Sequence, residues 1–160
     1  MKILGIDPGY ERLGIAVLEK KSAHEREVVL FSECFITSRT IPHHRRLRLI
    51  GDEIEKIVKE FAPAECAVET LFFSKNQKTA MQVSEARGVI LYKASSLGLE
   101  VFEYKPQSIK VATTGYGRSD KKQMTSMVEK LVKIDKKIKH DDEYDAIAVG
   151  ITHFASRGKI

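Results

Sequence analysis

The sequence predicts an α/β domain in which helices cover both faces of a mixed five-stranded sheet. Three apolar strand-like segments come first, and helical and strand-like segments alternate after them. Consecutive strands joined by short polar loops favour antiparallel pairing, whereas alternation with helices favours parallel pairing. A chain of 160 residues fits one domain and buries roughly 70% of its unfolded surface. We therefore expect a single domain over residues 1–160.

The first three strands are expected at residues 2–7, 13–19 and 27–37, which are mostly apolar runs. Pro8-Gly9 marks a turn after the first strand, and the polar stretch 20–26 suits a hairpin loop. These three strands are predicted to form an antiparallel meander.

A helix is expected at residues 42–61, where one apolar stripe repeats at spacings of 3, 4, 3 and 4. Pro42 suits its first turn, and Pro63 ends the pattern. Strands and helices then alternate, and Asp120 can cap one of the later helices. The expected strands are 65–71 and 99–104, and the expected helices are 76–97, 106–115, 120–133 and 141–156.

Positive charge is concentrated in one third of the chain. The net charge is +5, but residues 105–139 hold 10 basic and 3 acidic side chains, whereas residues 1–80 hold 13 and 12. Clustered cations favour a polyanionic partner, because each neutralised phosphate releases counterions. The run from Lys133 to Lys139 could alternatively be a solvated helix face.

The composition argues against several classes of protein. Cys34 and Cys66 belong to no CxxC or Cys/His cluster, so neither zinc nor a disulfide framework is expected, and both are interpreted as small core residues. No segment approaches the ~18 apolar residues of a membrane span. No signal peptide is visible before Asp7. We expect a cytoplasmic protein with no membrane partner.

Two acidic side chains belong to apolar strands. Asp7 ends the first strand directly before Pro8-Gly9, which is also where a turn-capping aspartate would lie. Glu69 stands in the run CAVETLFF, where strand alternation places it on the same face as Ala67. A carboxylate among apolar residues needs a metal, a cation or water. Glu69 could otherwise be a surface residue that faces the sheet edge.

Asp142 and Asp145 are spaced i, i+3 at the start of the last helix. This spacing places both on one face, with Cβ atoms roughly 5–6 Å apart. Capping of a helix N-terminus by acids is the alternative. Asp141 and Glu143 are interpreted as solvent-facing charges of that kind. The small residues that predict close packing of this helix on the sheet are Ala146, Ala148 and Gly150.

Together the four carboxylates favour a site for hard divalent ions. Their mutual repulsion would raise their pKa values, and Mg²⁺ removes that penalty because it binds oxygen ligands. Two such ions ~3.5–4 Å apart can clamp a phosphodiester for hydrolysis. With no Cys/His ligand cluster, we expect Mg²⁺, two ions per site, with Mn²⁺ as a substitute. The predicted activity is that of a nuclease.

Six segments in order resemble the RuvC family of Holliday junction resolvases, which have an RNase H-like fold. They are GIDPG (5–9), AVETLFFSKN (67–76), EARGV (85–89), VFEYKPQSIK (101–110), GYGRSDKKQM (115–124) and DEYDAIAVGITH (142–153). GIDPG alone also resembles actin-like ATPases, but those need two domains around the nucleotide. The resemblance implies a crossover junction endodeoxyribonuclease that acts in DNA recombination and repair.

The resemblance also implies the residues of the site. The metal-binding acids would be Asp7, Glu69, Asp142 and Asp145. The DNA-binding candidates are Phe72, Lys75, Lys110, Arg118, Lys121 and Lys122, with Phe72 as the base-stacking residue and either Lys121 or Lys122 at the scissile phosphate. The implied partners are four-way junction DNA, a second copy of the chain in a homodimer, and a branch-migration motor made of a junction-binding protein and a ring ATPase.

Some alternatives stay open. The segment 13–16 departs from the family's Thr-Gly-aromatic-Gly pattern and is closer to YqgF-type RNA-processing relatives. The basic residues 43–48 could contact a junction arm or be solvated turns of a helix. The wide apolar surface of the 76–97 helix fits a dimer interface or a fully buried helix. A junction-binding protein without cleavage is the alternative function, although the intact acids argue against it.

Overall fold

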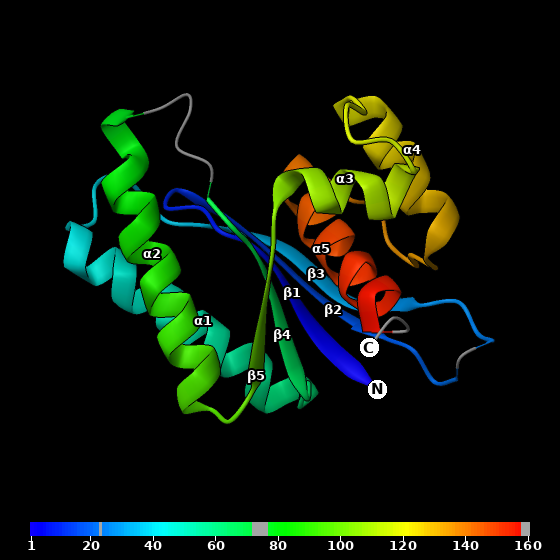
Figure 1. Cartoon of the computed structure of the whole chain (residues 1–160). Helices are drawn as coiled ribbons and strands as arrows, with labels where there is room; N and C mark the ends of the chain where they lie inside the picture. The colour runs from blue at the N-terminus through cyan, green and yellow to red at the C-terminus, as the bar shows by residue number, and fades with distance from the viewer. Residues whose placement is uncertain (23, 72–76, 158–160) are drawn as a thin grey trace.

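In the computed structural model, which describes residues 1–22, 24–71 and 77–157, a five-stranded sheet separates two layers of helices (Figure 1). The strands are β1 (Lys2–Asp7), β2 (Arg12–Glu19), β3 (Val28–Ile36), β4 (Glu65–Glu69) and β5 (Glu100–Tyr104). The helices are α1 (His43–Phe61), α2 (Gln77–Ser96), α3 (Pro106–Thr114), α4 (Lys121–Leu131) and α5 (Asp141–Arg157). Every predicted element is present, with its ends shifted by at most two residues.

The strand order is β3-β2-β1-β4-β5, so β1 lies at the centre of the sheet. β1 pairs antiparallel with β2 and parallel with β4. β2 pairs antiparallel with β3, and β4 pairs parallel with β5. The predicted meander and mixed sheet are confirmed. Because β1 and β4 run in the same direction, their carboxyl ends meet at one edge of the sheet.

The two faces of the sheet are covered by different helices. α1 and α2 pack on one face, and α5 packs on the other with α3 and α4 outside it (Figure 1). The predicted apolar stripe of α1 points inward, since Ile50, Ile54 and Ile57 are buried. On α2, Met81 and Tyr92 are 74% and 71% exposed. The alternative of a fully buried helix is therefore wrong for α2.

Small residues allow α5 to lie close against β1 and β2. A Cβ atom added at Gly5 would lie 2.5 Å from the Ala146 carbonyl oxygen, and one added at Gly150 would lie 2.7 Å from Leu18 Cδ1. Gly5 has no room for a side chain because the obstacle is backbone, and at Gly150 the buried Leu18 side chain would have to shift. This close approach, which the small residues of the last helix predict, fixes where α5 begins relative to the carboxyl end of β1.

The basic run from Lys133 to Lys139 is not a helix face. It follows α4, and Lys133 forms a backbone bridge with Val28 at the start of β3. The Lys133 N–H donates to the Glu27 carbonyl at 3.0 Å, and the Lys133 carbonyl accepts from the Val29 N–H at 3.0 Å. The expectation of a helix is therefore wrong for this run, because Lys133 pairs with the sheet and the residues after it are irregular, although the lysine side chains are exposed as a solvated surface requires.

Cysteine placement agrees with the sequence prediction. Cys34 and Cys66 are buried free thiols, and burial raises the pKa of Cys66 to about 12.

Across the described ranges, none of the helices combines the length and the apolar character needed to cross a membrane.

Candidate active site

Asp7 and Glu69 end neighbouring parallel strands. Ile6 of β1 lies opposite Val68 of β4, so the residues that follow them, Asp7 and Glu69, stand side by side at the carboxyl edge of the sheet. Ala67 packs with residues of α5, and alternation along the strands turns Asp7 and Glu69 toward that same face. Both carboxylates therefore leave the sheet on the side that α5 covers.

The start of α5 lies directly over this edge of the sheet. Gly14 of β2 pairs with Asp7. A Cβ atom added at Gly14 would overlap the Asp142 carbonyl oxygen and lie 3.1 Å from Asp7 Cβ. Asp145 follows Asp142 by three residues, on the same helix face. The beginning, middle and end of the chain thus bring the four predicted acids together.

Burial and mutual repulsion raise the pKa values of Asp7, Glu69 and Asp145. The pKa of Asp7 lies well above its usual range because of burial, then the charges of Glu69 and Asp145 and a hydrogen bond with Glu69. Burial raises the pKa of Glu69 to about 6. Burial also raises the pKa of Asp145, against the opposing charge of Lys121. A divalent cation would relieve this unfavourable concentration of negative charge.

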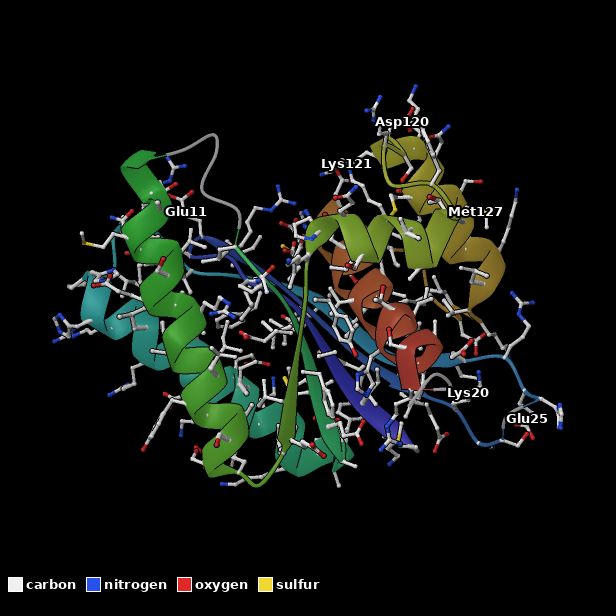
Figure 2. All side chains as sticks on the ribbon, viewed as in Figure 1. Glu11, Lys20, Glu25, Asp120, Lys121 and Met127 are labelled. Carbon is white, nitrogen blue, oxygen red and sulfur yellow. The ribbon has the colours of Figure 1, made fainter. Side chains whose placement is uncertain are left out.

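A cavity of about 260 Å³ opens beside Glu69 and Asp145. Lys110 of α3 and Lys121 of α4 also line it, and their charges oppose the rise in the pKa of Asp145. Figure 2 shows Lys121 where α4 begins, at the end of the molecule where α3 and α5 also meet. The other residues that line the cavity are Pro106, Ile109, Ser119, Asp120 and Met124. The cavity therefore places cations next to carboxylates, as a metal-bound phosphate would require.

The donor set fits a hard divalent ion, because all four acids offer the carboxylate oxygens that Mg²⁺ and Mn²⁺ prefer. As the side chains stand, no group of three or more His, Cys, Asp or Glu among the described residues is gathered tightly enough to hold an ion. Asp142 instead forms an ion pair with Arg12. The charges of the site thus fit a metal, while one of its acids is shared with a cation of the chain itself.

Comparison with known proteins identifies the family. The family model for crossover junction endodeoxyribonuclease RuvC matches residues 3–153. The chain belongs to the RuvC family. It is 46% identical over 152 residues to RuvC of Thermosipho melanesiensis, covering 93% of this chain and 94% of the relative. The solved structure of T. thermophilus RuvC in complex with Holliday junction substrate has a TM-score of 0.90 and 31% identity, covering 99% of this chain and 96% of that one. The RNase H-like fold that the resemblance to the RuvC family implies is confirmed.

Sequence reasoning missed Arg12, which opens β2 and contacts an acid of this candidate site. Its guanidinium forms an ion pair with Asp142, and its Nη2 lies 3.2 Å from His140 Nδ1. Cys34 Sγ also donates to Asp142 Oδ2, at 3.6 Å. The available signal in the sequence is slight: Arg12 begins the strand that pairs with the strand of Asp7.

Glu143 is buried, so the prediction of a solvent-facing side chain is wrong. It is 4% exposed, and its carboxylate accepts from Ser32 Oγ at 2.9 Å and from Lys136 Nζ at 2.6 Å. Lys136 also donates to the Ser32 carbonyl. These three residues, the Glu143 clamp, attach the start of α5 to β3. Asp141, in contrast, is exposed as predicted and pairs with Lys121 at 3.0 Å.

A buried cation, Arg46 of α1, holds the loop that follows Asp7. Its guanidinium lies 3.7 Å from the centre of the Tyr10 ring, and its Nε donates to Thr37 Oγ1 at 2.9 Å. Its Nη2 donates to the Tyr10 and Thr37 carbonyls, both at 3.3 Å. Arg46 is therefore a structural residue of the basic 43–48 segment. The exposed residues of that segment are His44, Arg45 and Arg48.

The predicted DNA-binding residues of the RuvC resemblance lie in different places. Lys110 and Lys121 line the cavity beside Glu69 and Asp145, which we call the acid cavity, whereas Lys122 lines a neighbouring cavity of about 460 Å³. Arg118 is exposed in the loop between α3 and α4. Of the two adjacent lysines, Lys121 is thus the one beside the acids. The predicted residues that fall outside the described part of the chain are Phe72 and Lys75.

Proposed function

We propose that this chain resolves four-way (Holliday) DNA junctions by divalent-metal-dependent hydrolysis. The proposed metal ligands are Asp7, Glu69, Asp142 and Asp145. The observation that carries the proposal is the meeting of Asp7 and Glu69 with the start of α5 at one sheet edge, beside a cavity lined by two lysines. Membership of the RuvC family supports the choice of substrate. We propose two Mg²⁺ ions per site, which Mn²⁺ could replace.

In this mechanism the chain positions charge around one phosphate. The strands hold Asp7 and Glu69 in place, and α5 brings Asp142 and Asp145 to them. When bound, the ions would supply a nucleophile at neutral pH and offset negative charge that develops on the phosphate. The lysines of the cavity bind the scissile phosphate and orient it toward the acids. The proposed products are a 5′-phosphate and a 3′-hydroxyl.

A second copy of the chain would supply the second nick. A four-way junction offers two equivalent strands, so a two-fold dimer can present one acid site to each. We place α2 in the interface, because Met81 and Tyr92 are exposed on it. Phe72 is proposed to stack on bases at the crossover, and the remaining basic residues to bind the DNA backbone. A junction-binding protein and a ring ATPase are the proposed further partners.

The test is cleavage of a mobile four-way junction with each strand labelled in turn, in Mg²⁺ and in EDTA. We expect paired nicks at symmetric positions in opposite strands, in Mg²⁺ alone. Asp7→Asn should keep junction binding in a gel-shift assay but lower cleavage at least about 100-fold, because the loss of a ligand removes several kcal/mol of transition-state stabilisation. Asp135→Asn, which changes an exposed acid paired with Lys133, is the matched control and should cleave normally.

Each contrary outcome has a separate meaning. Undiminished cleavage by Asp7→Asn would remove the four acids as the catalytic site. Junction binding by the wild-type chain with no cleavage in Mg²⁺ or Mn²⁺ would leave a binding module. Faster cleavage of structured RNA than of the junction would favour a YqgF-type activity.

A further inference from the structure

The Arg12–Asp142 ion pair engages one of the four proposed metal ligands. Arg12 Nη2 donates to Asp142 Oδ2, and Cys34 Sγ donates to the same oxygen at 3.6 Å. A carboxylate oxygen has about two acceptor lone pairs, so these two donors occupy those of Oδ2. His140 Nδ1 lies 3.2 Å from the same Arg12 nitrogen and helps to hold the guanidinium. Asp142 Oδ2 therefore already has a full set of partners within the chain.

The two members of this pair differ in how firmly they are held. The backbone of Asp142 lies against Gly14, and the Glu143 clamp attaches the next residue to β3. The Arg12 side chain is 48% exposed, whereas that of Asp142 is 22% exposed. Arg12 can leave by rotation about its side-chain bonds into solvent, without a change in the backbone. The pair is therefore built so that the arginine moves and the acid stays.

We propose that Arg12 is a built-in counter-cation, which occupies Asp142 in the metal-free protein and is exchanged for the divalent ion. The inference rests on the proposed metal site. Because both cations need the same carboxylate, each weakens the binding of the other. Arg12 is thus a positioning residue: it keeps Asp142 neutralised at the site before the metal binds, and it lowers the metal affinity of the free protein.

Metal affinity without DNA tests this directly. Calorimetric titration with Mn²⁺ should show about 2- to 5-fold tighter binding to Arg12→Gln than to the wild type, which is the size expected for loss of competition from a partly exposed ion pair. Arg12→Lys should fall between them, because lysine keeps the charge but lacks the planar fork of donors. Arg39→Gln is the matched control. It removes one positive charge from an exposed pair with Glu11 and should change the affinity far less.

A double-mutant cycle assigns the effect to the pair. In an Asp142→Asn background, Arg12→Gln should no longer tighten Mn²⁺ binding. The Mg²⁺ concentration that gives half-maximal cleavage should fall in Arg12→Gln by the same factor as the Mn²⁺ affinity rises. Circular dichroism and thermal unfolding establish that each variant is folded, and Arg12→Lys carries the test if Arg12→Gln is not.

The outcomes separate this inference from the function on which it rests. Equal Mn²⁺ affinities of Arg12→Gln and Arg39→Gln would overturn the role of Arg12, and so would a tightening that persists in the Asp142→Asn background. If the wild-type chain does not bind Mn²⁺, or if Asp145→Asn binds it as tightly as the wild type does, the proposed metal site itself fails.

Discussion

Asp7 and Glu69 stand on inner strands of the sheet, whereas Asp142 and Asp145 stand on the first turns of a helix laid across it. β1 and β4 each have a paired strand on both sides, so the backbone fixes the strand acids. The helix acids depend on packing and on side-chain contacts from distant segments, such as the Glu143 clamp. The two halves of one acid site are therefore held by different forces.

The two halves also differ in electrostatics. Burial and neighbouring charge raise the pKa values of Asp7 and Glu69, whereas Asp142 is paired with Arg12. Burial raises the pKa of Asp145 as well, so the electrostatic contrast lies with Asp142, which pairs with an arginine of the chain itself. The strand acids are rigid but unfavourably charged, whereas the geometry of the site is most easily lost at the helix.

Gly14→Ala should have the largest effect, because it pushes the two halves apart. The added Cβ would overlap the Asp142 carbonyl oxygen and lie 3.1 Å from Asp7 Cβ, so the start of α5 must move. Overpacking of this kind costs about 1–3 kcal/mol of unfolding free energy. A misplacement of about 1 Å can lower the rate about 100-fold. Thermal unfolding and junction cleavage measure the two losses.

Gly51→Ala separates this effect from a general packing defect. Its added Cβ would lie 3.3 Å from Val89 Cγ1 and 3.4 Å from Lys93 Cε, which are side-chain atoms that can yield. We expect a change of about 1 kcal/mol or less and normal cleavage. Normal cleavage by Gly14→Ala as well would mean that the sheet does not fix the position of α5.

Lys136→Met tests how the helix half is attached to β3. It leaves the 4% exposed Glu143 carboxylate without its cation. Removal of one partner from a buried pair costs about 3–5 kcal/mol. Because Lys136 is itself 45% exposed, we expect about 1–3 kcal/mol in chemical denaturation. Lys133→Met, which breaks an exposed pair with Asp135, should cost less than about 1 kcal/mol, and an equal cost would mean that the clamp does not anchor α5.

Local patterns were sufficient to predict the elements of the strand half. The 3-4 spacing of apolar residues located α1, and alternation placed Glu69 on the face of Ala67. The order of strands and helices along the chain predicted the mixed sheet, whose parallel pairing sets Asp7 beside Glu69. Each of these inferences needs only the spacing of apolar residues, with a period of two in a strand or 3.6 in a helix, or the order of elements along the chain. None needs knowledge of individual side-chain contacts.

Side-chain partners in the helix half could not be predicted in this way. Glu143 can be buried because its carboxylate accepts a hydrogen bond from Ser32, 111 residues earlier, and pairs with Lys136. Arg12 is separated from Asp142 by 130 residues. Many pairs of acids and bases in a chain with 27 basic and 22 acidic residues are chemically equivalent until the fold selects among them. Contacts of this kind follow from tertiary packing and leave no local pattern.

Asp7→Asn and Asp142→Asn should affect the metal-free protein differently. Asp7→Asn removes a buried acid whose pKa is raised, so the free energy of unfolding at pH 8 should increase, by about 1 kcal/mol on the scale usual for single substitutions, or roughly 2–4 °C in unfolding temperature. Asp142→Asn loses the ion pair with Arg12 and should be neutral or destabilising by less than about 1 kcal/mol. Thermal unfolding in EDTA compares the two.

The pH dependence of that comparison identifies its cause. A carboxyl group whose pKa is raised in the folded state destabilises that state as the pH rises from the ordinary carboxyl range through the raised value, which for Glu69 is about 6. The gain in unfolding free energy of Asp7→Asn over the wild type should therefore be small near pH 4 and largest near pH 8. Saturating Mg²⁺ should reverse it, because the metal stabilises the wild-type site. A gain that does not vary with pH would point to improved packing.

Asp141→Asn should have the smallest effect, and it marks the outer limit of the helix half. The Asp141 side chain is 66% exposed and pairs with Lys121 at 3.0 Å. An exposed pair of this kind contributes about 0–1 kcal/mol, so the unfolding temperature should hardly change. Lys121, released from Asp141, still lines the acid cavity, so cleavage should stay the same or rise slightly. A loss of cleavage as large as that of Asp145→Asn would instead place Asp141 among the metal ligands and extend the acid site beyond the four carboxylates.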